Sequence, residues 1–433
     1  MQFAQIAIEI LRVIGTIITV LYLHKAVFFV VGFFKVKRFK PTEHKHFYGI
    51  CVAARNEEKV IGNFLESVAN QDYPLDKLTV FVMAHNCTDG TAEVVKKLQN
   101  VGGIKIVLYE HNCPTERTKG YALKRLFEMI GDDYGIDCFD GYFVFDADNV
   151  IAKNYVTKMN EAFDEGSKIV TSFRNSKNVN RNWISFGYAM HWLRTCLTEN
   201  RAKGYLNQAC RVQGTGFLFS NELVKDGWKY TTLTEDRSFC TDAVVQGYRI
   251  SYCEEAVFYD EQPYSLKVAL RQRVRWAKGH LQSTVENCPK LLKNMFKRNG
   301  NFWITYDSFF LNFPRSVESG VRKILKYILQ IYIAIATASV YGWAVGLISG
   351  YLSGKVSSWA GSILVELAVF IKYGKNIEGE SAIKRLWHIF MFPFFDIIGK
   401  WSNYVALFKK VEWKAIPHDT VVDVEKLGGK REK

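Results

Sequence analysis

Short apolar runs alternate with amphipathic segments across the middle of the chain, from about residue 47 to residue 260. The apolar runs typical of buried strands span residues 48–54, 78–84, 104–109 and 142–145. The patterns typical of helices span residues 57–69, begin near residue 91 and span 121–130. Because strands that alternate with helices at this spacing usually form a parallel sheet, the pattern predicts a doubly wound, mostly parallel α/β domain.

A long apolar stretch precedes this domain. Residues 6–34 are nearly all apolar, and a helix of this length can span a bilayer. Four ionisable residues interrupt the stretch, namely Glu9, Arg12, His24 and Lys25. We therefore expect a helix that is tilted or partly packed against protein.

The pattern changes again after residue 262. Residues 268–282 are basic and helical, and residues 285–320 are mixed and aromatic, which is typical of helices on a membrane surface. Residues 324–348 form a strong candidate for a second membrane span, and residues 359–371 form a shorter and weaker candidate.

The last apolar segment, residues 386–408, contains Pro393, Asp396 and Lys400 and has basic residues on both sides. We expect a kinked or interfacial helix here rather than a crossing, giving one span before the domain and two or three after it. The expected divisions are an N-terminal transmembrane helix (1–40), the α/β domain (41–265), interface helices (266–322), transmembrane or interfacial helices (323–410) and a polar cytoplasmic tail (411–433).

Composition supports a globular domain fused to a few membrane segments. The 433 residues are 48% hydrophobic and 15% aromatic, yet the mean hydropathy is only −0.07. The nine cysteines are scattered and never in Cys-x-x-Cys spacing, so a zinc site or a disulfide framework is unlikely and a reducing compartment fits best.

The formal net charge of +14 indicates an anionic partner or surface. Much of this charge flanks the apolar stretches, as in the cluster Lys35, Lys37, Arg38 and Lys40. By the positive-inside rule this cluster places the following domain in the cytoplasm. No helix–turn–helix or aromatic RNA-binding signature is present, so we expect no nucleic-acid partner.

Two carboxylates, Asp146 and Asp148, follow directly after the apolar run 142–145. Ligands of α/β sheets usually bind at the carboxyl ends of the parallel strands. Carboxylates in this position can bind Mg²⁺ or Mn²⁺, which in turn holds a diphosphate. A solvated surface turn explains the pair equally well at this stage.

The loops after the first two strands lie at the same sheet edge. The first contains Arg55 and Glu57, and the second contains Asp89 in Asp89-Gly90-Thr91. Together they could bind a nucleotide, although the second is also a typical turn and helix cap. Lys119 begins another helical pattern, where it could neutralise phosphate or simply be exposed.

Two further motifs could handle a sugar. Gly214, Thr215 and Gly216 form a glycine-rich turn that could let the backbone approach a sugar or could be a plain hairpin turn. In Thr234-Glu235-Asp236, Asp236 is a candidate general base for an attacking hydroxyl. The alternative is a helix start capped by Thr234, with both acids in its first turn.

A basic helix contains Gln272, Arg275 and Trp276. Residues at i, i+3 and i+4 share one helix face, so these three side chains point the same way. Arginine can offset the charge of a leaving diphosphate, and tryptophan offers a flat wall to a sugar ring. A helix on a membrane surface would carry the same residue types.

In this order, the motifs resemble family 2 glycosyltransferases, and more narrowly the membrane-embedded branch that contains cellulose, chitin, hyaluronan and poly-N-acetylglucosamine synthases. The resemblance covers residues 47–285 and depends on Asp89-Gly90-Thr91, Asp146-x-Asp148, Thr234-Glu235-Asp236 and Gln272-x-x-Arg275-Trp276. It implies a GT-A fold, a nucleotide-sugar donor, inversion at the anomeric carbon and a Mg²⁺ or Mn²⁺ cofactor.

The resemblance also implies a role for each residue. Donor contacts would come from Arg55, Glu57, Asp89, Lys119, Asp146, Asp148, Gln272, Arg275 and Trp276. The metal would bind mainly Asp148, with Asp146 beside it, and Asp236 would be the base. The acceptor would contact Gly214, Thr215, Gly216, Glu235 and Trp276.

We therefore expect an integral membrane enzyme, in the plasma membrane, that transfers a sugar from a UDP-sugar to a saccharide. The chain has fewer candidate spans than long-chain synthases, which line a polymer channel. A single addition to a lipid acceptor, or a pore formed by homo-oligomers, are therefore alternatives. An inactive membrane scaffold is the alternative from another class, but every expected acid is present.

Overall fold

A mixed eight-stranded sheet lies at the centre of the described chain. The structure is a computed structural model that describes all residues except 100, 298–300, 338, 378–380, 412–415 and 425–433. In spatial order the strands are β3 (Lys105–His111), β2 (Leu78–His85), β1 (Tyr48–Ala54), β4 (Gly141–Asp146), β7 (Phe217–Ser220), β6 (Ile169–Ser176), β8 (Ser251–Asp260) and β5 (Val150–Ile151).

The predicted α/β domain and its four predicted strands are confirmed. These four strands are β1 to β4, and they run parallel to one another. Strand β7 is antiparallel to β4 and β6, β5 is antiparallel to β8, and β6 and β8 are parallel. The second half of the sheet is therefore more mixed than strand–helix alternation alone predicts.

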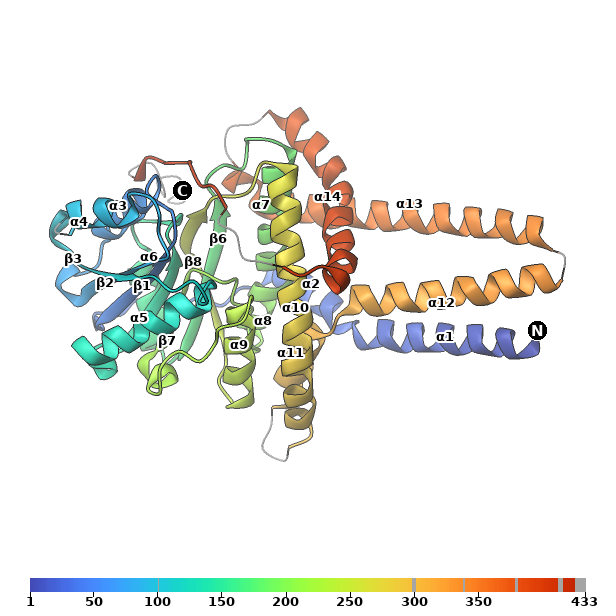
Figure 1. Cartoon of the computed structure of the whole chain (residues 1–433), viewed down its shortest axis with the longest axis horizontal. Helices are drawn as coiled ribbons and strands as arrows, with labels where there is room; N and C mark the ends of the chain where they lie inside the picture. Colours follow the sequence, from blue (N-terminus) through green and yellow to red (C-terminus); the bar gives the residue numbers. More distant parts are fainter. Residues whose placement is uncertain (100, 298–300, 338, 378–380, 412–415, 425–433) are drawn as a thin grey trace.

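Helices cover both faces of the sheet (Figure 1). One face packs against α3 (Ile61–Ala69), α4 (Thr91–Lys97) and α6 (Tyr155–Asp164). The other packs against α5 (Lys119–Asp133), α7 (Trp183–Thr195) and α9 (Glu235–Val245). Each layer encloses a core of fully buried apolar side chains, so the strand ends between them are held rigidly. Single 3₁₀ turns lie at Leu75–Lys77, Val101–Gly103, Ile136–Cys138, Asn221–Val224 and Gly374–Asn376.

Helices α1 (Gln2–Leu21), α12 (Arg315–Ala336) and α13 (Val340–Tyr373) project away from the α/β domain (Figure 1). The segments Gln2–Phe34 and Tyr341–Tyr373 are long and apolar enough to cross a membrane among the residues described. Large apolar side chains on the projecting helices are exposed, which is the surface expected of a helix that contacts lipid.

The predicted span at residues 6–34 is two helices rather than one. The first is α1, and the second is α2 (His24–Phe34), which packs against the domain. The break is explained by contacts with α11 (Phe302–Asn312), because His24 Nε2 and Lys25 Nζ lie 3.1 and 2.7 Å from Asp307 Oδ1. Packing of this segment against protein agrees with the ionisable residues that interrupt it.

The predicted span at residues 324–348 is wrong. Helix α12 ends at Ala336 and α13 begins at Val340, so the stretch is divided between two helices. Residues 359–371 then lie in the second half of α13 rather than forming a separate element. A hydropathy pattern misses this helical hairpin because the residues on both sides of the turn are apolar.

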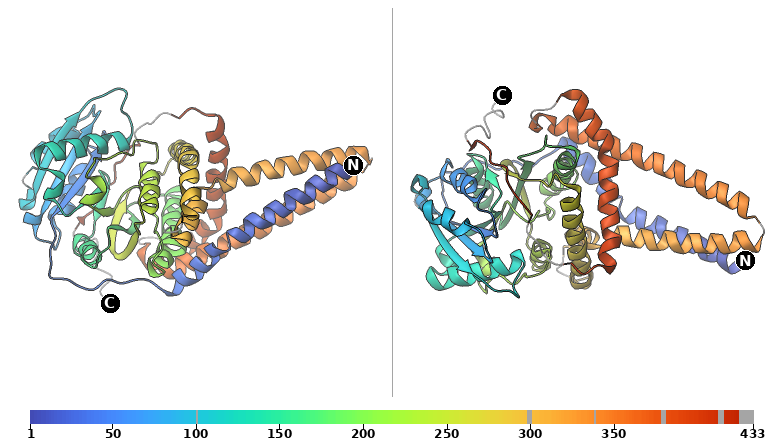
Figure 2. Two further views of the ribbon diagram at one scale, coloured as in Figure 1. Left: turned by 90° about the horizontal axis from the view of Figure 1, so that it is seen from below. Right: turned by 45° about the horizontal axis from the view of Figure 1, so that its top comes forward.

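Three helices lie between the sheet and the projecting helices (Figure 2). They are α10 (Leu266–Met295), α11 and α14 (Ala382–Phe408). Helix α14 is continuous through Pro393 and runs across the projecting helices rather than along them (Figure 1). The location of this helix at a membrane interface stays a prediction. Lys278 Nζ of α10 donates to the Ala406 carbonyl oxygen of α14 at 3.1 Å.

One turn of π-helix, Cys196–Asn200, joins α7 to α8 (Arg201–Tyr205) and links the domain to α2. Gly32 of α2 approaches so closely that a Cβ atom there would lie 2.1 Å from the Leu197 carbonyl oxygen. Arg201 Nε donates to the Gly32 carbonyl oxygen at 2.6 Å, and its guanidinium also pairs with Glu254 of β8. Arg201 thus connects α2 to the sheet.

We expect Arg201→Met to destabilise the protein, because it leaves the Gly32 carbonyl oxygen without this donor and Glu254 without this cation. A lost hydrogen bond to a charged group at a buried position lowers the free energy of unfolding by about 2–3 kcal/mol. The measurement is the apparent melting temperature of the purified chain in detergent. Lys229→Met is the control, because the Lys229–Asp226 pair is exposed, and it should leave the melting temperature unchanged. Equal melting temperatures for both variants would contradict this role for Arg201.

Candidate active site

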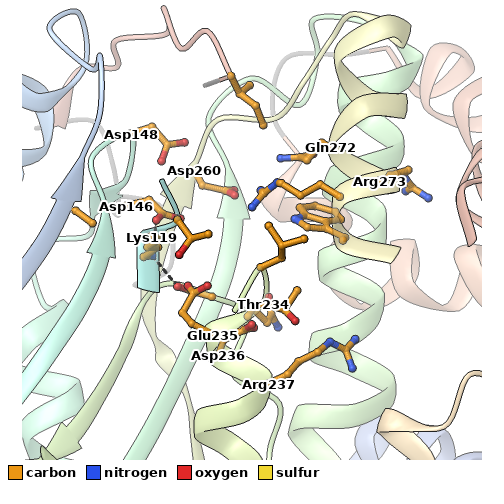
Figure 3. Close-up of a pocket in the computed structure, with 18 of the residues that line it drawn as sticks. Lys119, Asp146, Asp148, Thr234, Glu235, Asp236, Arg237, Asp260, Gln272 and Arg273 are labelled. Carbon is orange, nitrogen blue, oxygen red and sulfur yellow. Dashed lines mark hydrogen bonds and ion pairs between the residues drawn. The ribbon is translucent and has the colours of Figure 1, made fainter. Parts of the chain in front are cut away.

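A cavity of about 350 Å³ opens at the carboxyl ends of β1 and β4, between the sheet, α9 and α10. Figure 3 shows Asp146, Asp148 and Asp260 on one side of it and Gln272 of α10 on the other, with Asp236 between them. The residues predicted from sequence that line this cavity are Arg55, Glu57, Lys119, Asp146, Asp148, Gly214, Glu235, Asp236, Gln272, Arg275 and Trp276. Segments far apart in the chain therefore meet in one space.

Asp146 ends β4 and forms an ion pair with Lys119, the first residue of α5. Lys119 Nζ also donates to the Gly214 carbonyl oxygen at 2.8 Å. The backbone N–H of Asp146 donates to the Thr215 hydroxyl at 2.9 Å, and this hydroxyl donates to Asn149. The loop that carries Asp146 is therefore held by side chains rather than being a solvated turn.

Asp148 is 5% exposed, and its oxygens accept two hydrogen bonds. Oδ2 accepts from the Glu261 backbone N–H at 3.0 Å, and Oδ1 accepts from the Asn149 amide at 3.2 Å. This environment fixes the carboxylate at the base of the cavity, which a surface turn would not do.

Sequence reasoning missed three residues at this edge: Asp260, Glu261 and Arg174. Asp260 ends β8, and its Oδ2 accepts from Arg174 Nε of β6 at 2.8 Å. Burial, together with the neighbouring Asp148, raises the pKa of Asp260 to about 6 despite Arg174. The sequence pattern that could have identified Asp260 and Glu261 is an acidic pair directly after the apolar run 256–259, as at Asp146.

The carboxylates in this cavity fit a hard divalent cation. Burial raises the pKa of Glu57 to about 7, with Asp148 and Asp146 adding to the effect. Burial is the main cause of the raised pKa values of Glu57 and Asp260, and the neighbouring carboxylates contribute to both. A Mg²⁺ or Mn²⁺ ion prefers such oxygen ligands and would supply positive charge beside them.

Part of the predicted polar tail lies on this cavity. His418 Nδ1 lies 2.9 Å from Glu57 Oε2, and its Nε2 lies 3.9 Å from Asp148 Oδ2. Burial alone would lower the pKa of His418, but Asp148 and Glu57 raise it to about 10. The imidazolium therefore supplies positive charge beside the two carboxylates. No sequence pattern marked this histidine as a cavity residue.

Backbone hydrogen bonds hold the same tail segment in place. The N–H groups of Asp419 and Thr420 donate to Glu261 at 2.9–3.2 Å. Asn63 of α3 pairs with the Val422 backbone in both directions, at 2.9 and 3.1 Å. The described part of the tail is thus a specific element of the site rather than a separate appendage.

The N-terminus of α9 carries the candidate base. Thr234 is the N-cap residue of α9, and Glu235 and Asp236 lie in its first turn, so the predicted helix start is confirmed, although the Thr234 side chain makes no capping hydrogen bond. Thr234 instead packs against Gly279 of α10, where a Cβ atom would lie 2.5 Å from it. Burial raises the pKa of Glu235 to about 7, while Asp236 is half-buried and lines the cavity. The close approach at Gly279 fixes Asp236 relative to α10.

Helix α10 presents Gln272, Arg275 and Trp276 to the cavity, as their spacing predicts. Gln272 Oε1 is buried and has no hydrogen-bond partner. Trp276 packs edge-on against Trp192, with ring centroids 5.7 Å apart. Burial lowers the pKa of Arg275, and the nearest opposing influences are Glu235 and Asp146. Arg275 therefore brings positive charge into the cavity that Asp146 lines.

Three predicted contact residues do not line the cavity: Asp89, Thr215 and Gly216. Asp89 Oδ1 accepts from the Thr91 backbone N–H at 3.1 Å and so holds the turn before α4, whose N-cap is Gly90 rather than the threonine that the alternative interpretation named. Gly216 has φ +64°, and a Cβ atom there would lie 2.3 Å from the Phe258 ring. Any larger residue at position 216 would therefore clash with the Phe258 ring. A direct role of these residues in binding stays a prediction.

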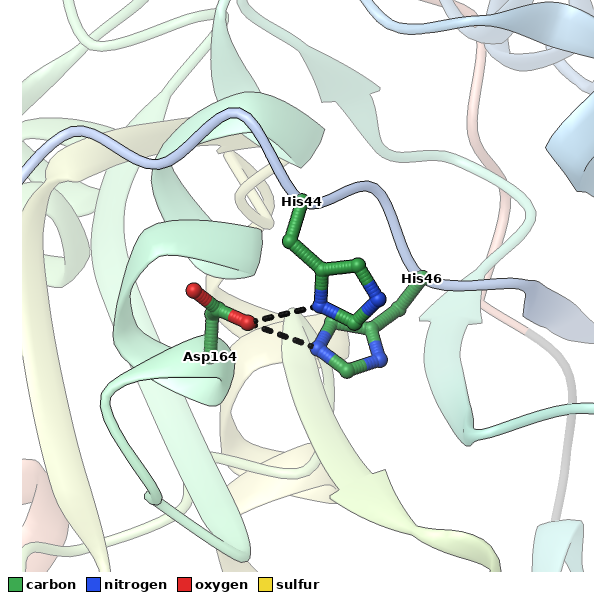
Figure 4. Close-up of side chains that lie close together, drawn as sticks. All are labelled: His44, His46 and Asp164. Carbon is green, nitrogen blue, oxygen red and sulfur yellow. Dashed lines mark hydrogen bonds and ion pairs between the residues drawn. The ribbon is translucent and has the colours of Figure 1, made fainter.

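Two further groups of possible metal ligands occur among the described residues, and His85 of the second group lines the same cavity. In the first, Asp164 Oδ1 accepts from His44 and His46 at 2.8 and 3.1 Å (Figure 4). Hydrogen bonds from Thr42 and then His44 lower the pKa of Asp164 to about 2. These residues precede β1 and β6, so the group lies at the opposite sheet edge from the cavity and ties the linker after α2 to α6. The second group is His85, His111 and Glu116, where Arg125 also binds Glu116.

Curated relatives match more than half of this chain. A probable glycosyltransferase of Bacillus subtilis, YdaM, is 24% identical over 68% of this chain and 70% of its own length. A poly-beta-1,6-N-acetyl-D-glucosamine synthase of Staphylococcus epidermidis is 26% identical over 59% of this chain. A beta-monoglucosyldiacylglycerol synthase of a Nostoc species is 24% identical over 57% of it. The matches span 62% and 52% of these two synthases.

A solved structure has the same fold. The mannosyltransferase PcManGT from Pyrobaculum calidifontis, in complex with GDP-Man and Mn²⁺, superposes with a TM-score of 0.58 at 17% identity. The match covers 86% of this chain and 100% of that one. The predicted GT-A fold is therefore confirmed, with its flanking apolar helices.

The family model described as "Glycosyltransferase like family 2" matches residues 44–279, which contain the whole sheet and all the motifs that line the cavity except the tail. The resemblance inferred from the motifs is thus confirmed over more than half of the chain, and the chain belongs to the glycosyltransferase-like family 2.

Proposed function

We propose that the chain is a membrane-anchored, metal-dependent, inverting glycosyltransferase that uses a UDP-sugar. The observation that supports this most is the meeting of Asp146, Asp148, Asp236 and Arg275 in one cavity. A non-catalytic scaffold would have no need to keep these four groups together. The relatives act on saccharide and lipid acceptors by name, and both acceptor classes are consistent with the motifs.

The proposed donor-binding half of the cavity is the half that lies beside the sheet edge. Arg55 and Glu57 would contact the nucleotide, and Asp146 and Lys119 would lie near its phosphates. Asp148, with Asp146 beside it, would hold a Mg²⁺ or Mn²⁺ ion, which supplies charge stabilisation to the leaving diphosphate. Arg275 and the unpaired Gln272 side chain complete the polar lining opposite.

Asp236 would accept the proton of an acceptor hydroxyl. As the acceptor oxygen bonds to the anomeric carbon, the bond between that carbon and the diphosphate oxygen breaks, and the nucleoside diphosphate leaves with the electron pair. Arg275 stabilises the charge where it develops. Attack from the Asp236 side, opposite the diphosphate, gives inversion in one displacement.

The proposed location is the plasma membrane, with the α/β domain in the cytoplasm. The apolar projecting helices support membrane anchoring, and the basic cluster at residues 35–40 supports the orientation. Nucleotide sugars are made in the cytoplasm, so this orientation gives the cavity access to its donor.

We expect Asp236→Asn to lower the transfer rate on the order of 10²–10⁴-fold, because an amide cannot take up the acceptor proton. Binding of UDP should be unchanged, since Asp236 does not contact the donor. The measurement combines transfer of radiolabelled sugar with UDP titration by calorimetry. Asp242→Asn, on the same helix and paired with Lys290 at 3.4 Å, is the control and should keep wild-type transfer. Wild-type turnover by Asp236→Asn would remove Asp236 as the base.

We also expect transfer to stop when a chelator removes divalent cations and to return on addition of Mn²⁺ or Mg²⁺. Asp148→Asn should raise the ion concentration that gives half-maximal rate at least tenfold, because it replaces an anionic ligand with a neutral one. Asp164→Asn, in the cluster at the opposite sheet edge, should leave that concentration unchanged. Full activity of the wild-type chain in chelator would reject metal dependence.

A further inference from the structure

Two arginines that the proposed mechanism does not use lie beside Asp236. Arg211 and Arg237 line the same cavity. Figure 3 shows the Arg237 guanidinium on the other side of Asp236 from Lys119, and so away from the donor carboxylates. Its side chain donates to the Leu311 carbonyl oxygen at 3.3 Å. Among the residues the structure describes, neither guanidinium forms an ion pair with a carboxylate.

Positive charge exceeds negative charge on this side of Asp236. Burial and the neighbouring Arg211 lower the pKa of Arg237 to about 10. The acids on this side other than Asp236 are Glu199, which lines the second cavity and acts electrostatically on both arginines, and Asp307, which lies 2.7 and 2.6 Å from the Nζ atoms of Lys25 and Lys203. The four cations Arg211, Arg237, Lys25 and Lys203 therefore face only three acids, Asp236, Glu199 and Asp307, so positive charge is left in excess here.

A second cavity, of about 230 Å³, continues from this point toward the projecting helices. It shares Ala277, His280 and Asn403 with the first cavity. Its far end is lined by the junction of α1 and α2, at Tyr22 and Lys25, and by the junction of α11 and α12, at Phe310, Phe313 and Arg315. The route from Asp236 thus ends where the apolar helices begin.

The chemistry of this route matches an anionic amphiphile. Phe310 and Phe313 offer apolar surface, while Arg315 lies over the Tyr22 ring at 4.1 Å and adds positive charge at the same depth. A neutral saccharide would leave the charge of Arg211 and Arg237 unbalanced in a partly desolvated space, which is unfavourable. A phosphate group suits the planar donor array of arginine, which binds it through two hydrogen bonds.

We propose that Arg211 and Arg237 bind the phosphate group of a lipid acceptor whose hydrocarbon chain passes through the second cavity toward α1 and α12. This inference rests on the proposed function and names the acceptor class for it. The accepting oxygen bonds to the anomeric carbon while the diphosphate leaves, and its proton, where it carries one, passes to Asp236. The oxygen belongs either to the phosphate itself, in a lipid monophosphate, or to a headgroup hydroxyl beside it.

The first test measures binding without a donor. A long-chain alkyl phosphate is titrated into the full chain in neutral detergent, with calorimetric detection. We expect Arg211→Gln and Arg237→Gln each to raise its dissociation constant about tenfold or more, as the loss of a charged hydrogen bond implies. Arg→Lys variants should retain part of the affinity, and UDP binding should not change. Lys225→Gln, at an exposed basic residue outside both cavities, is the control.

Equal affinity of the wild type and both glutamine variants for the alkyl phosphate would overturn the proposal. Inorganic phosphate added as a competitor separates the sources of the ligand. If it displaces the alkyl phosphate at equal concentration, the site binds free phosphate and the assignment to a lipid fails. If far more is needed, the hydrocarbon chain contributes to binding.

The second test follows transfer in phosphatidylcholine vesicles that contain diacylglycerol, phosphatidylglycerol or the alkyl phosphate, with a soluble oligosaccharide as a further arm. We expect labelled product on one of the two phosphate-bearing lipids, with loss of that product in Arg211→Gln. Transfer to diacylglycerol or to the oligosaccharide that the arginine variants leave unchanged would overturn the proposal. Absence of UDP release in every arm would reject the proposed function instead, while the binding test would still stand.

Discussion

The need to balance buried carboxylates with positive charge shapes the whole cavity. Asp146 ends β4, Asp148 follows two residues later and Asp260 ends β8, so three carboxylates gather at one sheet edge. Burying like charges close together is unfavourable unless cations lie beside them. The cations come from distant parts of the chain. Lys119 begins α5, Arg174 lies in β6, and His418 comes from beyond the last helix. The elements that carry these groups must pack together before the acidic residues can share the site.

The membrane side of the molecule depends on a similar balance. Asp307 of α11 forms ion pairs with Lys25 of α2 and Lys203 of α8. One acid therefore connects the N-terminal helices, the domain and the interface helices. Breaking a buried pair of this kind leaves an uncompensated charge, which costs more than the pair itself contributes. The orientation of the projecting helices relative to Asp236 is therefore determined by polar contacts, although the helices themselves are apolar.

Sequence patterns identified the residues at strand ends and on helix faces. The end of an apolar run marks a strand end, and the helical period shows which side chains share a face. Asp146, Asp236 and the Gln272–Trp276 face line the cavity as these patterns predict. Arg174 and His418 could not be found this way, since their positions depend on strand order and on a tail that packs back over the sheet. The division between α12 and α13 was not predicted for a different reason. Hydropathy measures polarity and does not detect the end of one apolar helix and the start of the next.

The π-helical turn at Cys196–Asn200 determines how α8 is rotated about the helix axis relative to α7. Such a turn accommodates an additional residue relative to regular α-helix, and each residue of an α-helix rotates the chain by roughly 100°. Removing one residue there would restore regular winding but turn Arg201 and Lys203 away from Gly32 and Asp307. A single residue of helical register thus decides how the sheet and the apolar projecting helices are oriented relative to each other.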